Sequence, residues 1–219
     1  MNLGQVFIQS SAFYLPLGLF LYVLFYHPKE RLALSLGILS FSVSQLLLRI
    51  PLLNLLSTQA FFIVFSMKYI YWFIAFLSIS AALFEETARY LFIRYGLKEL
   101  RLQSILSFGL GHGGIEAIVL VGMSTLFTST SLVDSTALFY GGIERISAML
   151  LHVSLSLLVA LSIQKSSKTH LFMAYTIHSA INYSLIALLQ LGFNVFALES
   201  IFLVVSIGLF YFLIKRTQK

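Results

Sequence analysis

The segment TALFYGGIERISAMLLHVSLSLLVALSI, residues 136–163, is apolar along most of its length, yet it carries Glu144, Arg145 and His152. A bilayer crossing takes about 20 predominantly apolar residues, and this segment is long enough. The rest of the chain has the same character, since 59% of its 219 residues are hydrophobic and 10% are charged. A soluble domain has roughly 25% charged residues. The sequence therefore predicts an all-α, polytopic transmembrane helical bundle.

Six other segments are also long and apolar enough to cross a membrane. The seven predicted spans are residues 6–26, 32–53, 60–95, 103–127, 136–163, 171–191 and 195–214. The third is longer than a bilayer requires, so we expect it to break or to project from the membrane. Pro28 and Pro51 are expected to end the first two spans. We predict one transmembrane domain over residues 1–219, with its core motifs in about residues 60–190.

Basic residues fall mostly on one side of these spans. Lys29, Arg31, Arg89, Arg94, Lys98, Arg101, Lys165, Lys168, Lys215, Arg216 and Lys219 share that side, whereas Arg49 falls in an opposite loop. By the positive-inside rule this asymmetry predicts an N-out, C-in orientation. The same asymmetry explains the net charge of +6 by membrane topology and contact with the lipid bilayer, rather than by nucleic-acid binding. Without cysteine, the chain has no disulfide, thiol nucleophile or cysteine-based zinc site.

Ionisable residues lie inside four predicted spans, where charged side chains are costly and usually functional. They are Glu85, Glu86 and Arg89; His112 and Glu116; Glu144, Arg145 and His152; and His178, which is followed by Asn182. At about 1.5 Å per residue from the predicted cytosolic helix ends, one residue of each span lies roughly 10–17 Å deep: Glu86, His112, His152 and His178. A site between the helices of a bundle requires such a shared depth. We therefore predict that these residues meet.

Spacing within the helices supports an inward polar face. His112 and Glu116, like His178 and Asn182, are four residues apart and share one helix face. Glycines around His112 are expected to let a neighbouring helix approach closely. Structural explanations are open for individual residues: a lone buried histidine for His152, and an ion pair with another helix for Glu144 and Arg145. Lys68 is expected to meet an acid such as Glu144 or Glu116.

Three ordered motifs resemble those of the CPBP and Abi group of glutamate-dependent intramembrane proteases, which includes the Ras-converting CAAX prenyl endopeptidase and, more distantly, PrsW. The motifs are Glu85-Glu86-Thr87-Ala88-Arg89, Phe108-x-x-x-His112 and His178-x-x-x-Asn182. A closer resemblance, over about residues 52–183, is to the bacterial YhfC family of membrane peptidases. It rests on residues 84–90, on Gly111-His112-Gly113-Gly114-Ile115-Glu116-Ala117, and on Glu144-Arg145 with His152.

The wider resemblance implies a water activated by Glu85 with His112, and an oxyanion held by His178 and Asn182. Glu85, Glu86, Arg89, His112, His178 and Asn182 are then the catalytic set, supported by Phe108, Glu144 and Arg145. Arg89 follows Glu85 by four residues rather than the usual five, so which glutamate is the base stays open. No cofactor is required in this interpretation. The alternative is a zinc site built from His112, His152, His178 and Glu116.

The sequence thus predicts a multi-pass protease of the bacterial plasma membrane that opens toward the cytosolic half of the bilayer. Its expected partner is a peptide or membrane-protein substrate, and no oligomeric state is predicted. Two other functions stay open. Buried ionisable residues also build proton or cation-coupled transporters, although no inverted repeat is present. A non-catalytic immunity protein that keeps the protease fold is the second.

Overall fold

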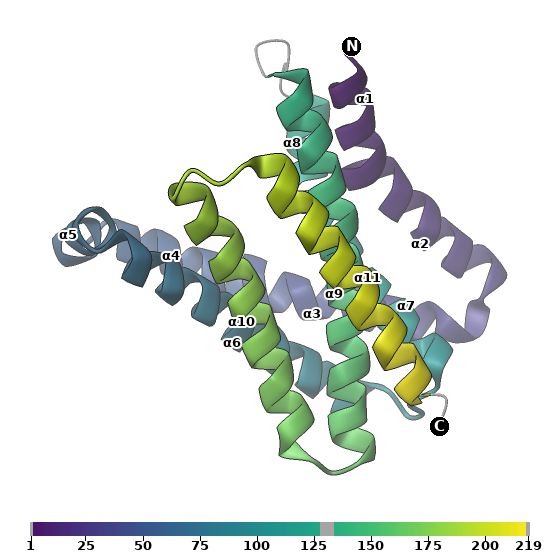
Figure 1. The fold of residues 1–219 in the computed structure, drawn as a ribbon. Coiled ribbons are helices and arrows are strands. Elements are labelled where there is room, and N and C mark those ends of the chain that lie inside the picture. The colour runs from purple at the N-terminus through teal and green to yellow at the C-terminus, as the bar shows by residue number, and fades with distance from the viewer. Residues whose placement is uncertain (1, 128–133, 218–219) are drawn as a thin grey trace.

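The computed structural model describes residues 2–127 and 134–217, and within them it contains helices and no strand. Seven helical stretches are long and apolar enough to cross a membrane: Leu3–Tyr26, Pro28–Ser57, Ile70–Gly96, Leu102–Phe127, Ser135–Gln164, Lys168–Gln190 and Val195–Thr217. Figure 1 shows them as one helical bundle with α9 in its middle. The predicted all-α membrane bundle with seven spans is confirmed. Lys219, counted with the basic residues of one side, lies outside the described residues.

Three of these stretches contain a π-helical segment. The first comprises α1 (Leu3–Gln9), η1 (Ser10–Tyr14) and α2 (Leu15–Tyr26), and a short turn η2 (Pro28–Glu30) follows. The second comprises α3 (Arg31–Phe41), η3 (Ser42–Arg49) and α4 (Ile50–Ser57). The fourth comprises α7 (Leu102–Glu116), η4 (Ala117–Gly122) and α8 (Met123–Phe127). Single π turns inside α-helices are rare and frequently accompany functional sites.

The helix does not end at Pro51, so the prediction of a turn at Arg49-Ile50-Pro51 is wrong. The chain stays helical to Ser57, and the amide of Ile50 donates to the carbonyl of Gln45, five residues back. A proline within a helix lacks an amide and crowds the carbonyl four residues before it. The wider π turn that precedes Pro51 changes this local geometry and lets the helix continue. Arg49 consequently lies inside the helix rather than in an outer loop.

The long third predicted span breaks, which was one of its two expected outcomes. The structure divides it at Tyr69 into α5 (Ala60–Lys68) and α6 (Ile70–Gly96). The ammonium of Lys68 lies 5.4 Å from the centre of the Tyr69 ring. No acid within salt-bridge distance of Lys68 is found among the described residues, so its expected pairing with Glu144 or Glu116 is wrong.

Helix α9 (Ser135–Gln164) packs against α7, α10 (Lys168–Gln190) and α11 (Val195–Thr217). Glycines of α7 allow its close approach to α9, as the sequence predicts. A Cβ atom added to Gly109 would lie 2.6 Å from the Cα of Val153, and one added to Gly113 would lie 2.9 Å from the Cβ of His152. The two helices therefore touch at the level of His112 and His152.

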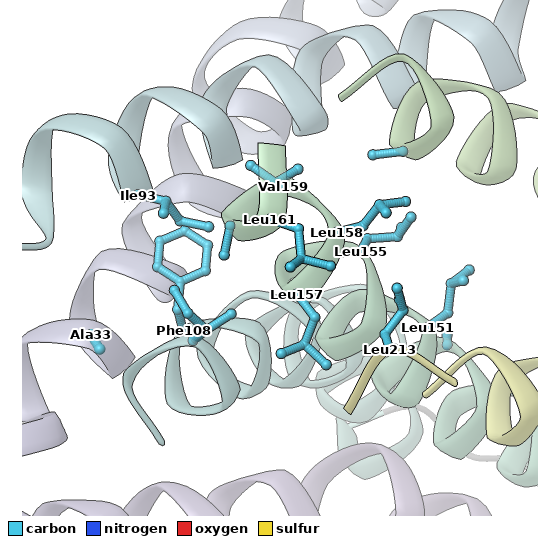
Figure 2. Close-up of a cluster of buried hydrophobic side chains, with 14 of the residues drawn as sticks. Ala33, Ile93, Phe108, Leu151, Leu155, Leu157, Leu158, Val159, Leu161 and Leu213 are labelled. Atoms are coloured by element: carbon cyan, nitrogen blue, oxygen red, sulfur yellow. The ribbon is translucent and has the colours of Figure 1, made fainter. Parts of the chain in front are cut away.

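Buried hydrophobic side chains of α9 pack in one cluster with those of the neighbouring helices (Figure 2). The apolar plug, as we name its central part, consists of Ile93, Ile105, Phe108, Leu155, Leu157, Leu158 and Leu161. On each helix these residues lie on the predicted cytosolic side of the ionisable ones: Ile93 follows Arg89, Ile105 precedes His112, and Leu155 follows His152. Phe108 is fully buried within the plug, so the structure places it in hydrophobic packing.

Candidate active site

Four helices bring their ionisable side chains together at the end of the apolar plug. Helix α6 contributes Glu85 and Glu86, α7 contributes His112, α9 contributes His152 and α10 contributes His178. All five are buried. Neighbouring histidine rings lie close, since the ring centres of His112 and His152 are 5.0 Å apart and those of His152 and His178 are 5.4 Å apart. The sequence-based expectation that these helices present polar residues at one depth agrees with this arrangement.

Glu85 lies at the centre of the group. Its Oε2 is 3.0 Å from Nε2 of His112 and 3.8 Å from Nδ1 of His152. Its Oε1 accepts a hydrogen bond of 2.5 Å from the side-chain amide of Gln45 in η3. Gln45 is in turn bonded to Arg49, whose NH1 donates to Gln45 Oε1 at 3.1 Å. The orientation of Glu85 is thus fixed from a helix that carries none of the expected site residues.

The neighbouring Glu86 has different partners. Arg89 NH1 donates to both of its oxygens, at 2.6 and 2.8 Å, and Nδ1 of His178 lies 2.7 Å from Oε1. Since the paired carboxylate can only accept, Nδ1 of His178 is the donor in this contact. Glu86 is fully buried within these contacts, whereas Glu85 faces the other two histidines. The two adjacent glutamates therefore have different surroundings. Glu85 faces the histidine pair, whereas Glu86 is ion-paired with Arg89.

His152 is held at both ring nitrogens. Arg89 NH2 lies 2.8 Å from Nδ1, and Glu116 Oε2 lies 2.6 Å from Nε2. A guanidinium only donates, so Nδ1 accepts and the ring proton of neutral His152 is on Nε2, whose close contact with Glu116 Oε2 lacks hydrogen-bond geometry. Glu116 also lies 3.5 Å from Arg145 NH1, and Arg145 bonds its neighbour Glu144. The expected ion pair between Arg145 and another helix is present, and it connects to His152 through Glu116.

A cavity of about 450 Å³ reaches Glu85 from the side opposite the apolar plug. Its polar lining comprises Gln45, Arg49, Ser78, Glu85, Glu116, Glu144, Arg145, Asn182 and Glu199. Asn182 thus faces the same space as Glu85, one helical turn from His178. In the predicted N-out orientation this is the outer side of Glu85. The opening toward the cytosolic half stays a prediction, because the side of the membrane that the cavity faces depends on that orientation.

Three residues of this site were missed from the sequence. Gln45 and Arg49 were not recognised because Arg49 was assigned to a loop, although their spacing of four residues inside an apolar span is the same signal used for His112 and Glu116. Glu199 was missed although it is a charged residue within the last span. It is buried, and its Oε2 has no hydrogen-bond partner in the described part of the chain.

The residues at the centre fit a metal ion. Glu85, His112 and His152 each offer a ligand atom, and these atoms lie within 4.8 Å of one another. Ligands about 2.0–2.2 Å from a tetrahedral zinc lie roughly 3–4 Å apart, close to the 3.0 and 3.8 Å seen here. The Glu116 contact on the far nitrogen of His152 is the type of support that histidine ligands receive. Arg89 NH2 is the one competing contact, since it occupies Nδ1 of His152.

This donor group differs from the zinc ligands expected from the sequence. His112 and His152 belong to both sets. Glu116 contacts the second ring nitrogen of His152, and His178 bonds Glu86. Glu85 is therefore the third member of the donor group, in place of Glu116 and His178.

Comparison with known proteins identifies the family. The model of a family described as YhfC intramembrane metalloprotease matches residues 12–136 and 126–207. The chain belongs to the YhfC family. A relative in Bacillus subtilis (strain 168), described as uncharacterized membrane protein YhfC, is 28% identical over an alignment length of 217, and the match covers 81% of this chain and 82% of that protein. No solved structure matches. Membership in the YhfC family, together with seven apolar helices, makes this chain a multi-pass plasma-membrane protein of an intramembrane protease family.

Proposed function

We propose that this chain is a metal-dependent endopeptidase that hydrolyses a peptide bond in or beside the membrane. One observation carries the proposal: Glu85, His112 and His152 place three ligand atoms within 4.8 Å of one another at the buried end of a cavity. Two imidazoles and a carboxylate are the ligands of many catalytic zinc sites. The metalloprotease description of the YhfC family supports the same chemistry.

Glu85, His112 and His152 would hold the metal, and a bound zinc supplies Lewis-acid activation of water near neutral pH. Glu116 orients His152 through Nε2 and lines the same cavity, so we assign to its carboxylate the transfer of a proton from water to the leaving amine. The Asn182 amide donates to the substrate carbonyl oxygen as negative charge develops there. Gln45 holds Glu85 in position.

A metal-free mechanism is the second candidate, and the 3.0 Å contact between His112 Nε2 and Glu85 Oε2 favours it. Here Glu85 takes the proton from water, His112 supports it, and His178 with Asn182 holds the oxyanion. This mechanism corresponds to the resemblance to CPBP and PrsW proteases. It gives His152 no chemical role beyond its contacts with Arg89 and Glu116.

His152 separates the two mechanisms. The purified full chain and its His152→Ala, Glu85→Gln and His27→Ala variants are analysed for metal by mass spectrometry, and each is assayed in nanodiscs against a peptide library. We expect the wild type and the His27→Ala control to hold about one zinc per chain and to cleave, because His27 lies in the turn before η2. His152→Ala and Glu85→Gln should lose both metal and cleavage.

Two other results lead to different conclusions. Cleavage by metal-free wild type that persists in a chelator, and in His152→Ala, supports the glutamate mechanism and excludes the metal one. Absence of peptide cleavage by wild type and every variant, together with ion flux in proteoliposomes, supports a transporter instead. Absence of both supports the non-catalytic immunity protein.

A further inference from the structure

The outer faces of α6 and α10 carry two cavities unrelated to the proposed active site. The first has a volume of about 480 Å³ and lies at the turn between α9 and α10. Two basic side chains and several hydroxyl groups line it: Arg94, Lys168, Ser162, Ser166 and Ser167. All five lie at helix ends that the sequence predicts to be cytosolic, which is where lipid headgroups are found.

The second cavity is an apolar groove of about 460 Å³ between the same two helices. Ala75, Ile79 and Leu83 of α6 form one wall, and Ala180 and Tyr183 of α10 belong to the other. Most of these side chains are exposed in the isolated chain, so within a membrane the groove faces lipid. Its small alanine residues leave room for one extended hydrocarbon chain.

The two cavities adjoin each other, because Phe172 and Tyr175 line both of them. From Phe172 to Tyr183 the groove follows eleven residues of α10, or about 17 Å at 1.5 Å per residue. One leaflet of a bilayer has a hydrocarbon depth of about 15 Å, half of the 30 Å layer. The combined site therefore has the polarity and the length of a phospholipid in one leaflet.

Charge specifies the headgroup. Arg94 and Lys168 have no acidic partner within salt-bridge distance among the described residues, whereas the nearby Arg101 pairs with Glu30 and Glu99. An anionic phosphate beside these two unpaired cations would neutralise them. A zwitterionic lipid would offer the same phosphate together with a cation of its own, which reduces this attraction.

We propose that this surface is a binding site for one anionic phospholipid, with its phosphate at Arg94 and Lys168 and one acyl chain in the groove. The site bears on the proposed chemistry through the helix pair that it covers. Tyr175 bonds the hydroxyl of Thr87 at 2.8 Å on the outer side, and His178 bonds Glu86 at 2.7 Å on the inner side. A bound lipid thus holds together the two helices that carry these residues.

Native mass spectrometry of the detergent-purified full chain tests the proposal without any substrate. The probes are dioleoyl phosphatidylglycerol, dioleoyl phosphatidylcholine and inorganic phosphate. Each basic residue near anionic lipid contributes about fivefold to affinity, so Arg94→Gln with Lys168→Gln should weaken phosphatidylglycerol binding about thirtyfold. The matched control is Lys215→Gln with Arg216→Gln, which removes two charges from the last turn of α11 and should leave this binding unchanged.

A second variant tests the groove. Ala180→Phe fills it from an exposed position, so the protein should fold and lose phosphatidylglycerol. Equal retention of the two lipids, or unchanged binding in either the Arg94 and Lys168 variant or Ala180→Phe, would overturn the proposal. Binding of inorganic phosphate as tight as that of the lipid would also overturn it, because the groove would then contribute nothing. Unchanged lipid retention with loss of cleavage in Ala180→Phe would instead assign the groove to a substrate helix.

Discussion

Replacement of Arg89 by methionine tests the central ion pair most directly. The side chains of Arg89 and Glu86 are fully buried, and Arg89 NH1 lies 2.6 Å from Glu86 Oε1. Removal of the guanidinium leaves a buried carboxylate supported only by His178, and removal of one partner from a buried pair costs about 3–5 kcal/mol. In a chain of this length each kcal/mol lowers Tm by about 2–4 °C. We therefore expect Arg89→Met to lower Tm by roughly 10 °C.

The double variant Arg89→Met with Glu86→Met completes the cycle. Both charges are then removed together, and apolar replacements of a buried pair are often neutral in stability. We expect the double variant to lose less stability than either single variant, by about 2 kcal/mol or more. Thermal unfolding in detergent, followed by size-exclusion fluorescence, measures all three. Lys98→Met is the control. Lys98 is exposed and has no acid within salt-bridge distance among the described residues, so this change should alter stability by about 1 kcal/mol or less. A double variant whose loss equals the sum of the two single losses would refute the reasoning.

Three further changes have defined outcomes. Gly109→Ala should lower Tm by several degrees, because its Cβ would meet the backbone of Val153. In the control Gly208→Ala the added Cβ meets nothing within 4 Å, so Tm should rise slightly. Equal shifts in Tm would contradict the close packing of α7 on α9. Gln45→Ala should lower peptide cleavage by about 10–100-fold with the fold intact, since it removes the hydrogen bond that orients the central carboxylate, and unchanged kcat/KM would exclude this positioning role. Glu199→Gln should raise stability by about 1 kcal/mol, because it removes the charge of a buried carboxylate that no salt bridge among the described residues neutralises. A lower Tm would contradict this reasoning.

The seven spans and the meeting of four polar helices could be predicted because both depend on simple lengths. Apolar runs fix where the helices lie, and a rise of about 1.5 Å per residue fixes the depth of each polar side chain. His112 and His152 therefore meet as the sequence indicates. The glycines of α7 correctly predicted a close helix contact, because residues without a side chain let the backbone of α9 approach.

Side-chain partners could not be predicted in the same way. Depth does not determine the direction in which a residue points around its helix, so the sequence could not assign Arg89 to Glu86 rather than to Glu85. The π-helical segment before Pro51 is another example. An extra residue in one helical turn changes every facing direction after it, and no residue type identifies such a turn reliably. Gln45 and Arg49 were missed because the helix was expected to end at Pro51, which assigned Arg49 to a loop.

The apolar plug also bears on the permeability of the membrane to protons. A polar cavity that enters halfway into a membrane shortens the distance over which the transmembrane voltage falls. The plug then lies between the buried carboxylates and histidines and the opposite aqueous phase. Its side chains act as electrical insulation as well as packing, because a gap beside Phe108 would admit water and conduct protons. Dense packing of the plug would therefore keep buried ionisable groups inside a membrane without opening a path for protons.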